Sequence, residues 1–184
     1  MNDSHTLIFM GLKHCGKSVL GGRLARRLGF AFEDLDHLIM GIAGDEGYAS
    51  IRELYRTVGL ENFQDYETAA LDKFFDFPET EGLILSLGGG TVENPSAMEI
   101  AKTRGVLVHL SVEEQVLYDR IIPGGIPPFL QGERSPRHMF HELFLHRSEL
   151  YRRYADMSIS LPDQSVGDNT ELIYSRLKEQ LYVR

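Results

Sequence analysis

The chain has 184 residues, of which 42% are hydrophobic and 25% charged, an ordinary composition for a folded protein long enough to bury a core. Its formal net charge of −8 argues against a general nucleic-acid binder, because such proteins need a basic face. The single cysteine, Cys15, excludes an intrachain disulfide, and no apolar run is long enough to span a membrane. We therefore expect a cytoplasmic protein with no nucleic-acid polymer and no membrane among its partners.

Short apolar runs and longer amphipathic stretches alternate along the chain, and turn-forming residues separate them. In chain order we predict a strand at 7–10, a helix at 17–28, a strand at 31–32, a helix at 50–77 interrupted near Gly59, a strand at 83–87, a helix at 95–104, a strand at 106–110, helices at 112–120 and 136–154, a strand at 157–161 and a helix at 170–182. This alternation is typical of an α/β fold whose mostly parallel sheet is covered by helices on both faces. No repeat or linker divides the chain, so we expect one domain over residues 1–184.

Residues 121–133 interrupt this pattern because prolines and glycines crowd together there. Neither a helix nor a central strand tolerates such a density of these residues, so we predict a long loop. A loop of this length in a compact domain is often functional.

The segment after the first predicted strand, residues 11–18, matches the phosphate-binding pattern G-x-x-x-x-G-K-[ST] at Gly11, Gly16, Lys17 and Ser18. A loop with this spacing presents backbone N–H groups to phosphate oxygens, and the helix that follows adds its dipole. Lys17 would reach the β- and γ-phosphates, and the Ser18 hydroxyl would bind Mg²⁺. The alternative is an ordinary glycine turn, but the strand before the pattern and the helix after it favour a nucleotide site.

Two carboxylates and three glycines follow the second and third predicted strands. Asp34 and Asp36 could divide the work, one holding Mg²⁺ and the other orienting an attacking hydroxyl group. A pair of helix N-cap residues is the alternative. Gly88, Gly89 and Gly90 end the third strand, where ligands bind in such sheets. Glycines let the backbone approach a ligand closely, although a flexible turn also uses them.

Four further features have weaker functional signals. Arg120 and Arg147 flank the predicted loop, and each could pair with a carboxylate or phosphate or be merely solvated. Cys15 could have a lowered thiol pKa beside Lys17, but phosphoryl transfer needs no thiol, and we interpret it as a small side chain that fills the loop. The seven histidines lack metal-ligand spacing, so we expect no zinc site.

Several of these motifs together resemble the shikimate kinases, from the first strand to at least Asp156. Residues 32–39, F-E-D-L-D-H-L-I, are similar to that family's F-x-D-x-D-x-x-I-E, with Met40 in place of the final Glu. The three glycines resemble its triple-glycine segment, and residues 147–156, R-S-E-L-Y-R-R-Y-A-D, resemble its R-x-x-L-Y-x-x-x-A-D stretch. The resemblance implies a three-layer P-loop kinase fold with five parallel strands in the order 2-3-1-4-5 and a mobile lid at 121–133.

The resemblance also implies a reaction and a role for each matching residue. The γ-phosphate of ATP would pass to a hydroxyl of shikimate, giving shikimate 3-phosphate, with Lys17 and Asp36 catalytic and Asp36 as the base. Ser18 and Asp34 would hold Mg²⁺, and Arg120 would pack on the adenine. The residues expected to bind the nucleotide are Gly11, Lys13, His14, Cys15, Gly16, Lys17, Ser18, Val19 and Arg120. Those expected to bind the acceptor are Asp36, Gln64, Gly88, Gly89, Gly90 and Arg147, whose guanidinium would pair with the shikimate carboxylate.

Two departures from the family pattern lie on the acceptor side. The family's F-R-x-x-E is F-Q-D-Y-E at residues 63–67, so Gln64 stands where the family has a second carboxylate-binding arginine. The lid's R-P-L-L is P-P-F-L at residues 127–130, so Pro127 stands where the family has the lid arginine. Losing an arginine that stabilises the transition state could cost orders of magnitude in rate.

Three hypotheses for the function follow. The first is an active shikimate kinase whose missing positive charge comes from Lys13, Arg134 or Arg137. The second is a kinase of a different small hydroxylated acceptor, and the third is a non-catalytic ATP-binding module. Asp34 and Asp36 argue against the third, because a pure binder needs no base for an acceptor. For the oligomeric state we favour a monomer.

Overall fold

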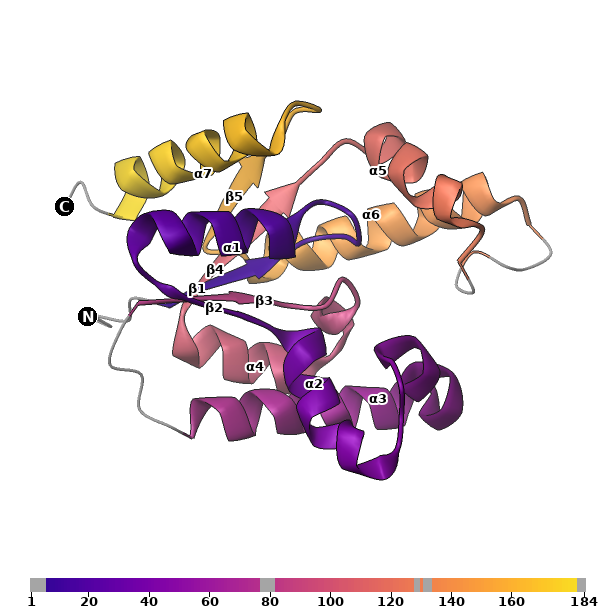
Figure 1. Cartoon of the computed structure of the whole chain (residues 1–184). Helices are drawn as coiled ribbons and strands as arrows, with labels where there is room; N and C mark the ends of the chain where they lie inside the picture. The colour runs from indigo at the N-terminus through magenta and orange to yellow at the C-terminus, as the bar shows by residue number, and fades with distance from the viewer. Residues whose placement is uncertain (1–5, 77–81, 128–129, 131–133, 182–184) are drawn as a thin grey trace.

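A computed structural model describes residues 6–76, 82–127, 130 and 134–181. Its centre is a parallel sheet of five strands in the order β2-β3-β1-β4-β5, which confirms the predicted order (Figure 1). The strands are β1 (Thr6–Met10), β2 (Ala31–Asp34), β3 (Leu83–Ser86), β4 (Val106–Ser111) and β5 (Met157–Ser160). Every residue of β1 is buried, as expected for a continuous apolar run at the middle of a parallel sheet.

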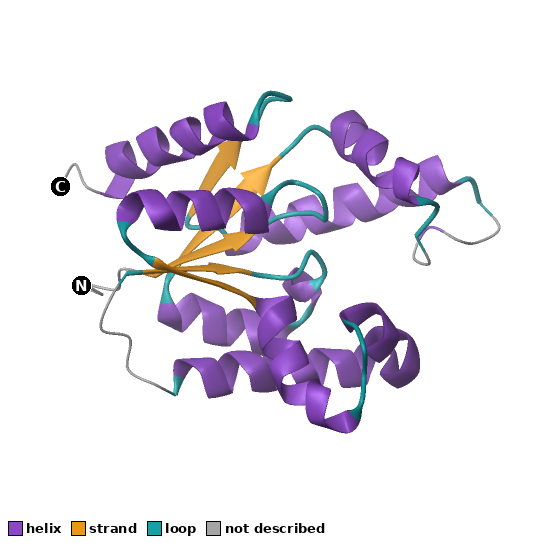
Figure 2. Ribbon diagram, viewed as in Figure 1, coloured by secondary structure: helices purple, strands orange, loops and turns teal. Residues whose placement is uncertain are grey.

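Helices cover both faces of the sheet (Figure 2). They are α1 (Lys17–Leu28), α2 (Leu35–Ala43), α3 (Ile51–Phe75), α4 (Pro95–Arg104), α5 (Glu114–Ile121), α6 (Pro136–Tyr154) and α7 (Val166–Leu181), with the short 3₁₀ helices η1 (Gly44–Glu46), η2 (Thr91–Glu93) and η3 (Ile122–Gly124). Helices α1 and α7 pack together on one face, and α3 packs on α4 at the other (Figure 1). Among the helices of the described residues, none combines the length and apolar character needed to cross a lipid bilayer.

The predicted break in α3 is present, and it separates a short first piece from a longer second one. Gly59 has φ 78° and ψ 177°, a conformation that glycine reaches without strain. The first piece begins with a reciprocal cap: Ser50 Oγ accepts from the Glu53 backbone N–H at 3.2 Å, and the Glu53 carboxylate accepts from the Ala49 N–H at 2.9 Å. The chain thus fixes a short helical segment, residues 51–58, that can take its own direction at the edge of the molecule.

The structure differs from the sequence predictions in three places. Helix α2 follows β2 directly, between the strand predicted at 31–32 and the helix predicted at 50–77, where the sequence pattern indicates no element. Helix α7 begins at Val166 rather than at residue 170, because the Ser165 hydroxyl accepts from the Asp168 backbone N–H and caps an extra turn. The predicted loop at 121–133 begins instead with the last residue of α5 and with η3; its residues 128–129 and 131–133 lie outside the described residues.

Candidate active site

The loop between β1 and α1 has the geometry of an anion site. Gly16 precedes α1 with φ 100°, and no side chain caps the exposed N–H groups of the helix at that position. Lys17 is buried, and its Nζ donates to the carbonyl oxygens of Gly11 at 2.8 Å and Leu12 at 3.2 Å. The ammonium group is therefore held against the backbone of its own loop. Helix N-terminus and lysine together form a site for phosphate.

Cations converge on this loop from more than one element. The pKa of His14 is lowered, first by its partial burial and then by the charges of Lys13, Lys17 and Arg120. Arg120, in the last turn of α5, reaches the loop by donating to the His14 carbonyl at 3.4 Å, and it pairs with Asp163 at 2.5 Å. The structure thus places Arg120 beside the phosphate loop.

Ser18 and Asp34 lie together, although they come from different elements. The Ser18 hydroxyl donates to one carboxylate oxygen of Asp34 at 2.5 Å, and Ser86 at the end of β3 lies 3.4 Å from the same hydroxyl. No group of three or more His, Cys, Asp or Glu side chains that could hold a metal occurs among the described residues. Mg²⁺ in nucleotide sites uses one or two protein oxygens together with phosphates and water, so a hydroxyl beside a carboxylate fits it.

The two aspartates after β2 have different roles in the fold. The second carboxylate oxygen of Asp34 accepts from the Asp36 backbone N–H at 3.0 Å, so Asp34 is also the N-cap of α2. The side chain of Asp36 is not used as a cap, and it lines a cavity. The pKa of Asp36 is raised, mainly by removal from water and next by the charge of Asp34, even though Lys17 and Lys13 act in the opposite direction. Asp36 is thus a carboxylate with increased basicity that is free to meet a ligand.

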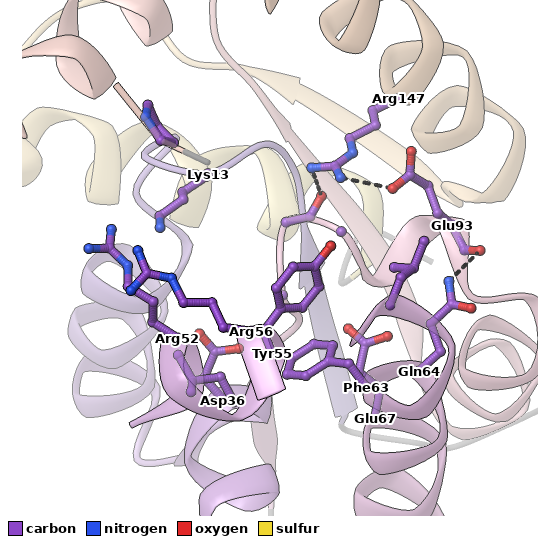
Figure 3. A pocket seen from close by; sticks show the side chains of 16 residues that line it. Lys13, Asp36, Arg52, Tyr55, Arg56, Phe63, Gln64, Glu67, Glu93 and Arg147 are labelled. Carbon is purple, nitrogen blue, oxygen red and sulfur yellow. Dashed lines mark hydrogen bonds and ion pairs between the residues drawn. The ribbon is translucent and has the colours of Figure 1, made fainter. Parts of the chain in front are cut away.

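The cavity beside Asp36 has a volume of about 250 Å³ (Figure 3). Its walls come from the phosphate loop, the start of α2, both pieces of α3, the glycines after β3 and α6. Gly89 must be a glycine for packing reasons, since a Cβ there would lie 2.9 Å from the Lys13 backbone nitrogen. Tyr55 and Phe63 add an apolar wall, and their rings meet edge to face at 5.2 Å. A cavity with one apolar wall and polar ends suits a small hydroxylated ring.

Arg147 lies on the side of the cavity away from Asp36, and its guanidinium already holds a carboxylate. It donates to the Gly89 carbonyl at 3.1 Å and to Glu93 at 2.8 Å. Gln64 donates to the backbone carbonyl of the same Glu93 at 3.1 Å (Figure 3). The Arg147 side chain is only 17% exposed, and its Nε has no hydrogen-bond partner among the described residues. This end of the cavity can therefore bind a carboxylate, and Glu93 competes for it.

Glu67 on the second piece of α3 also lines the cavity and binds the segment that follows the three glycines. It is buried, and its carboxylate accepts from the Thr91 hydroxyl at 2.6 Å and from the Asn94 amide at 3.1 Å. Burial raises the pKa of Glu67, although these two hydrogen bonds act against the shift. Glu67 thus fixes η2 directly after the three glycines. This role of Glu67 could not be predicted from the sequence, because a buried glutamate and a solvated one look alike in a helical pattern.

The structure brings most of the expected site residues together, with two differences. Lys13, expected at the nucleotide, lines the cavity, as does Pro127. Arg134 and Arg137, considered as sources of the missing charge, do not line it; Arg134 pairs with Glu142 at 2.6 Å and Arg137 with Glu114 at 3.3 Å. Both guanidinium groups thus pair with carboxylates outside the cavity, and their role as a source of the missing charge stays a prediction.

Among the cavity residues that were not predicted from the sequence are two cations, Arg52 and Arg56 on the first piece of α3. Their spacing of four residues on one helix face, with Tyr55 between them, is the signal that could have found them. An exposed arginine pair on a helix is nevertheless common, and only the tertiary structure turns this face toward a cavity.

Comparisons with known proteins agree with this geometry. A family model described as shikimate kinase matches residues 13–180. A shikimate kinase of Stenotrophomonas maltophilia is 31% identical over 98% of this chain and 96% of the relative, and one of Chlamydia pneumoniae is 34% identical over 82% and 83%. Among solved structures, a shikimate kinase of Acinetobacter baumannii in complex with shikimate superposes with a TM-score of 0.81 at 27% identity, over 97% of this chain and 96% of that one.

Proposed function

This chain belongs to the shikimate kinase family, and on that basis we propose that it transfers the γ-phosphate of ATP to a hydroxyl group of shikimate, giving shikimate 3-phosphate. As a family member it is an ATP-dependent phosphotransferase that acts on an alcohol acceptor. The observation that carries the proposal for shikimate is the cavity that runs from Asp36, beside the phosphate loop, to Arg147. A hydroxyl group and a carboxylate of one small ring would meet these two ends.

The phosphate loop binds the nucleotide in this proposal. Lys17 releases the carbonyl oxygens of Gly11 and Leu12 and turns to the β- and γ-phosphates, which are stronger acceptors because they are charged. Ser18 and Asp34 would hold Mg²⁺, which neutralises phosphate charge when bound. Arg120, from its position at His14, would border the base of the nucleotide.

Asp36 acts on the acceptor. The acceptor oxygen forms a bond to the γ-phosphorus while the bond from that phosphorus to the bridging oxygen of ADP breaks, and ADP leaves with the electron pair. The hydroxyl proton passes to the Asp36 carboxylate, which gives it up to water after product release. The raised pKa of Asp36 increases its ability to accept this proton.

Arg147 orients the acceptor at the other end. The substrate carboxylate would take over the Arg147 contact that Glu93 makes at 2.8 Å, and the backbone of Gly89 and Gly90 would border the ring. Because Glu93 already pairs with Arg147 and because Gln64 carries no charge, an acceptor without a carboxylate is a second candidate.

An acceptor panel tests the proposal directly. The protein is incubated with ATP and Mg²⁺ together with shikimate, with cyclic polyols that lack a carboxylate, or with no acceptor, and phosphorylated products are measured by mass. We expect shikimate to be phosphorylated fastest. Faster transfer to a polyol would establish the second candidate, and ATP binding without transfer to any acceptor would establish a non-catalytic nucleotide binder.

Charge at Gln64 is expected to control the affinity for shikimate. Gln64→Arg places a guanidinium beside Glu93 and the carboxylate end of the cavity, so we expect the Kd of shikimate to fall by about 5- to 150-fold, the equivalent of about 1–3 kcal/mol for a charged hydrogen bond. Arg147→Ala should abolish most of the binding. Titration calorimetry measures both effects.

Gln115→Arg on the exposed face of α5 is the matched control, because it adds the same charge outside the cavity. It should leave the affinity unchanged. If Gln64→Arg fails to tighten binding and Arg147→Ala does no harm, the cavity does not recognise the carboxylate of shikimate.

A further inference from the structure

Two cations on the first piece of α3 line the cavity and have no hydrogen-bond or ion-pair partner in the described part of the chain. Arg52 and Arg56 both line it, and neither makes a hydrogen bond or ion pair with another described residue. The neighbouring carboxylate of Glu53 is used to cap the helix, where it accepts from the Ala49 N–H at 2.9 Å. Both guanidinium groups are therefore available to an anion that enters the cavity.

Their position is at the phosphate end of the cavity. In Figure 3 the guanidinium groups of Arg52 and Arg56 lie on the same side as Lys13 and Asp36, whereas Arg147, Glu93 and Gln64 lie on the opposite side. Lys13 belongs to the phosphate loop, and Asp36 marks the place of the acceptor hydroxyl in the proposed function. An anion between these groups would be the phosphoryl group in transfer.

The charges around the cavity support this assignment. Of its acidic side chains, Glu93 pairs with Arg147, and Glu67 is held by Thr91 and Asn94. At the phosphate end the cavity is lined by three cations, Lys13, Arg52 and Arg56, and by the carboxylate of Asp36, which also lies near the charges of Asp34 and Glu67. The chain as a whole carries a formal net charge of −8. An excess of positive charge at one end of a cavity in an acidic protein indicates a site for an anion.

The positive charge that the lid arginine supplies in the family pattern has no other source at the phosphate end of the described cavity lining. Pro127, which lines it, stands at the position where the family pattern has the lid arginine, and proline offers no charge. Arg134 and Arg137 are paired with Glu142 and Glu114. Among the described residues, the cations at this end of the cavity are thus Lys13 and the α3 pair.

We propose that Arg52 and Arg56 contact the γ-phosphoryl group during transfer and stabilise the negative charge of the transition state, in place of an arginine from the lid. This inference rests on the proposed phosphate transfer to an acceptor bound beside Asp36. Planar guanidinium groups match phosphoryl oxygens in pairs, and charge in this reaction spreads over three such oxygens. The two arginines make no covalent bond and exchange no proton; they offset charge that grows as the bond to ADP breaks.

The test compares the double variant R52A/R56A with the parent and with Arg153→Ala, an exposed arginine on α6 outside the cavity. We expect kcat of the double variant to fall about 100-fold or more, by analogy with the loss of other transition-state donors. The KM for shikimate should change by no more than about threefold, since the carboxylate end is intact. R52K/R56K should recover part of kcat, and Arg153→Ala should match the parent.

Three outcomes would overturn the inference: parent-like kcat in R52A/R56A, a raised KM with unchanged kcat, or an equal loss in Arg153→Ala. The raised KM would instead make the pair a ligand of the acceptor. The proposed acceptor fails separately, if the parent does not phosphorylate shikimate. In that case the same variants are compared in ATP hydrolysis, which develops the same phosphoryl charge; a loss in the double variant supports the inference, and parent-like hydrolysis rejects it.

Discussion

Asp36→Asn should reduce phosphate transfer by about 100- to 10 000-fold, the usual contribution of a positioned general base. The amide keeps the size of the carboxylate but cannot accept the hydroxyl proton. Asp34, Ser18 and Lys17 remain in place, so ATP binding should be nearly unchanged. Steady-state kinetics with shikimate and calorimetric titration with ATP measure the two effects on the same preparation.

Asp72→Asn, an exposed position on the second piece of α3, is the matched control and should transfer phosphate at the parent rate. The assignment of the base fails if Asp36→Asn turns over as fast as the parent.

The same substitution should also change how stability depends on pH. The pKa of Asp36 is raised above its ordinary value of 3.8, so the fold favours the neutral acid. The stability that this neutral form contributes is present below pH 3.8 and is lost as the pH rises through the raised pKa. Asp36→Asn, which cannot ionise, should therefore have a higher melting temperature than the parent at neutral pH and an equal one below pH 3.8.

The rate of the parent should respond to the same ionisation. Because the base must be ionised, kcat should fall in acid at a pH above 3.8. A melting-temperature difference that persists unchanged into strong acid would mean that ionisation of Asp36 is not its cause.

Lys17→Ala should remove the stabilisation that ATP and Mg²⁺ give to the fold. At an ATP concentration about one hundred times the Kd, binding adds about 2.7 kcal/mol. For a chain of this size that gain raises the melting temperature by about 5–10 °C. The variant loses this increment because its loop lacks the ammonium group for the phosphates. Thermal melts with and without ATP measure the difference.

The quantity to compare is the rise in melting temperature that ATP causes in each variant. Lys17 also binds the carbonyl groups of Gly11 and Leu12 in its own loop, so its loss can lower the melting temperature even without ligand. Lys102→Ala, an exposed lysine on α4, should keep the full increment. An undiminished increment in Lys17→Ala would place the nucleotide elsewhere in the molecule.

Features that depend on local spacing could be predicted from the sequence. The phosphate loop is of this kind, because eight consecutive positions define how its backbone wraps an anion and a helix begins directly after it. The strands and the break at Gly59 also follow from short-range patterns, and the alternation of strands and helices restricts the sheet to few topologies. Helix α2 was missed because nine residues give a weak period, although Asp34 provides a cap.

By itself, then, the sequence determined the fold class, the nucleotide loop and the aspartates beside it, since each depends on a pattern of residues that are close together in the chain. Only the tertiary structure decided the charges around the acceptor. Arg147 meets Glu93 across 54 residues of chain, and the α3 arginines reach the phosphate end because the helix breaks at Gly59 and its first piece takes its own direction. Such pairings depend on where separate elements pack, and the identity of an exposed arginine carries no information about the group that it will face.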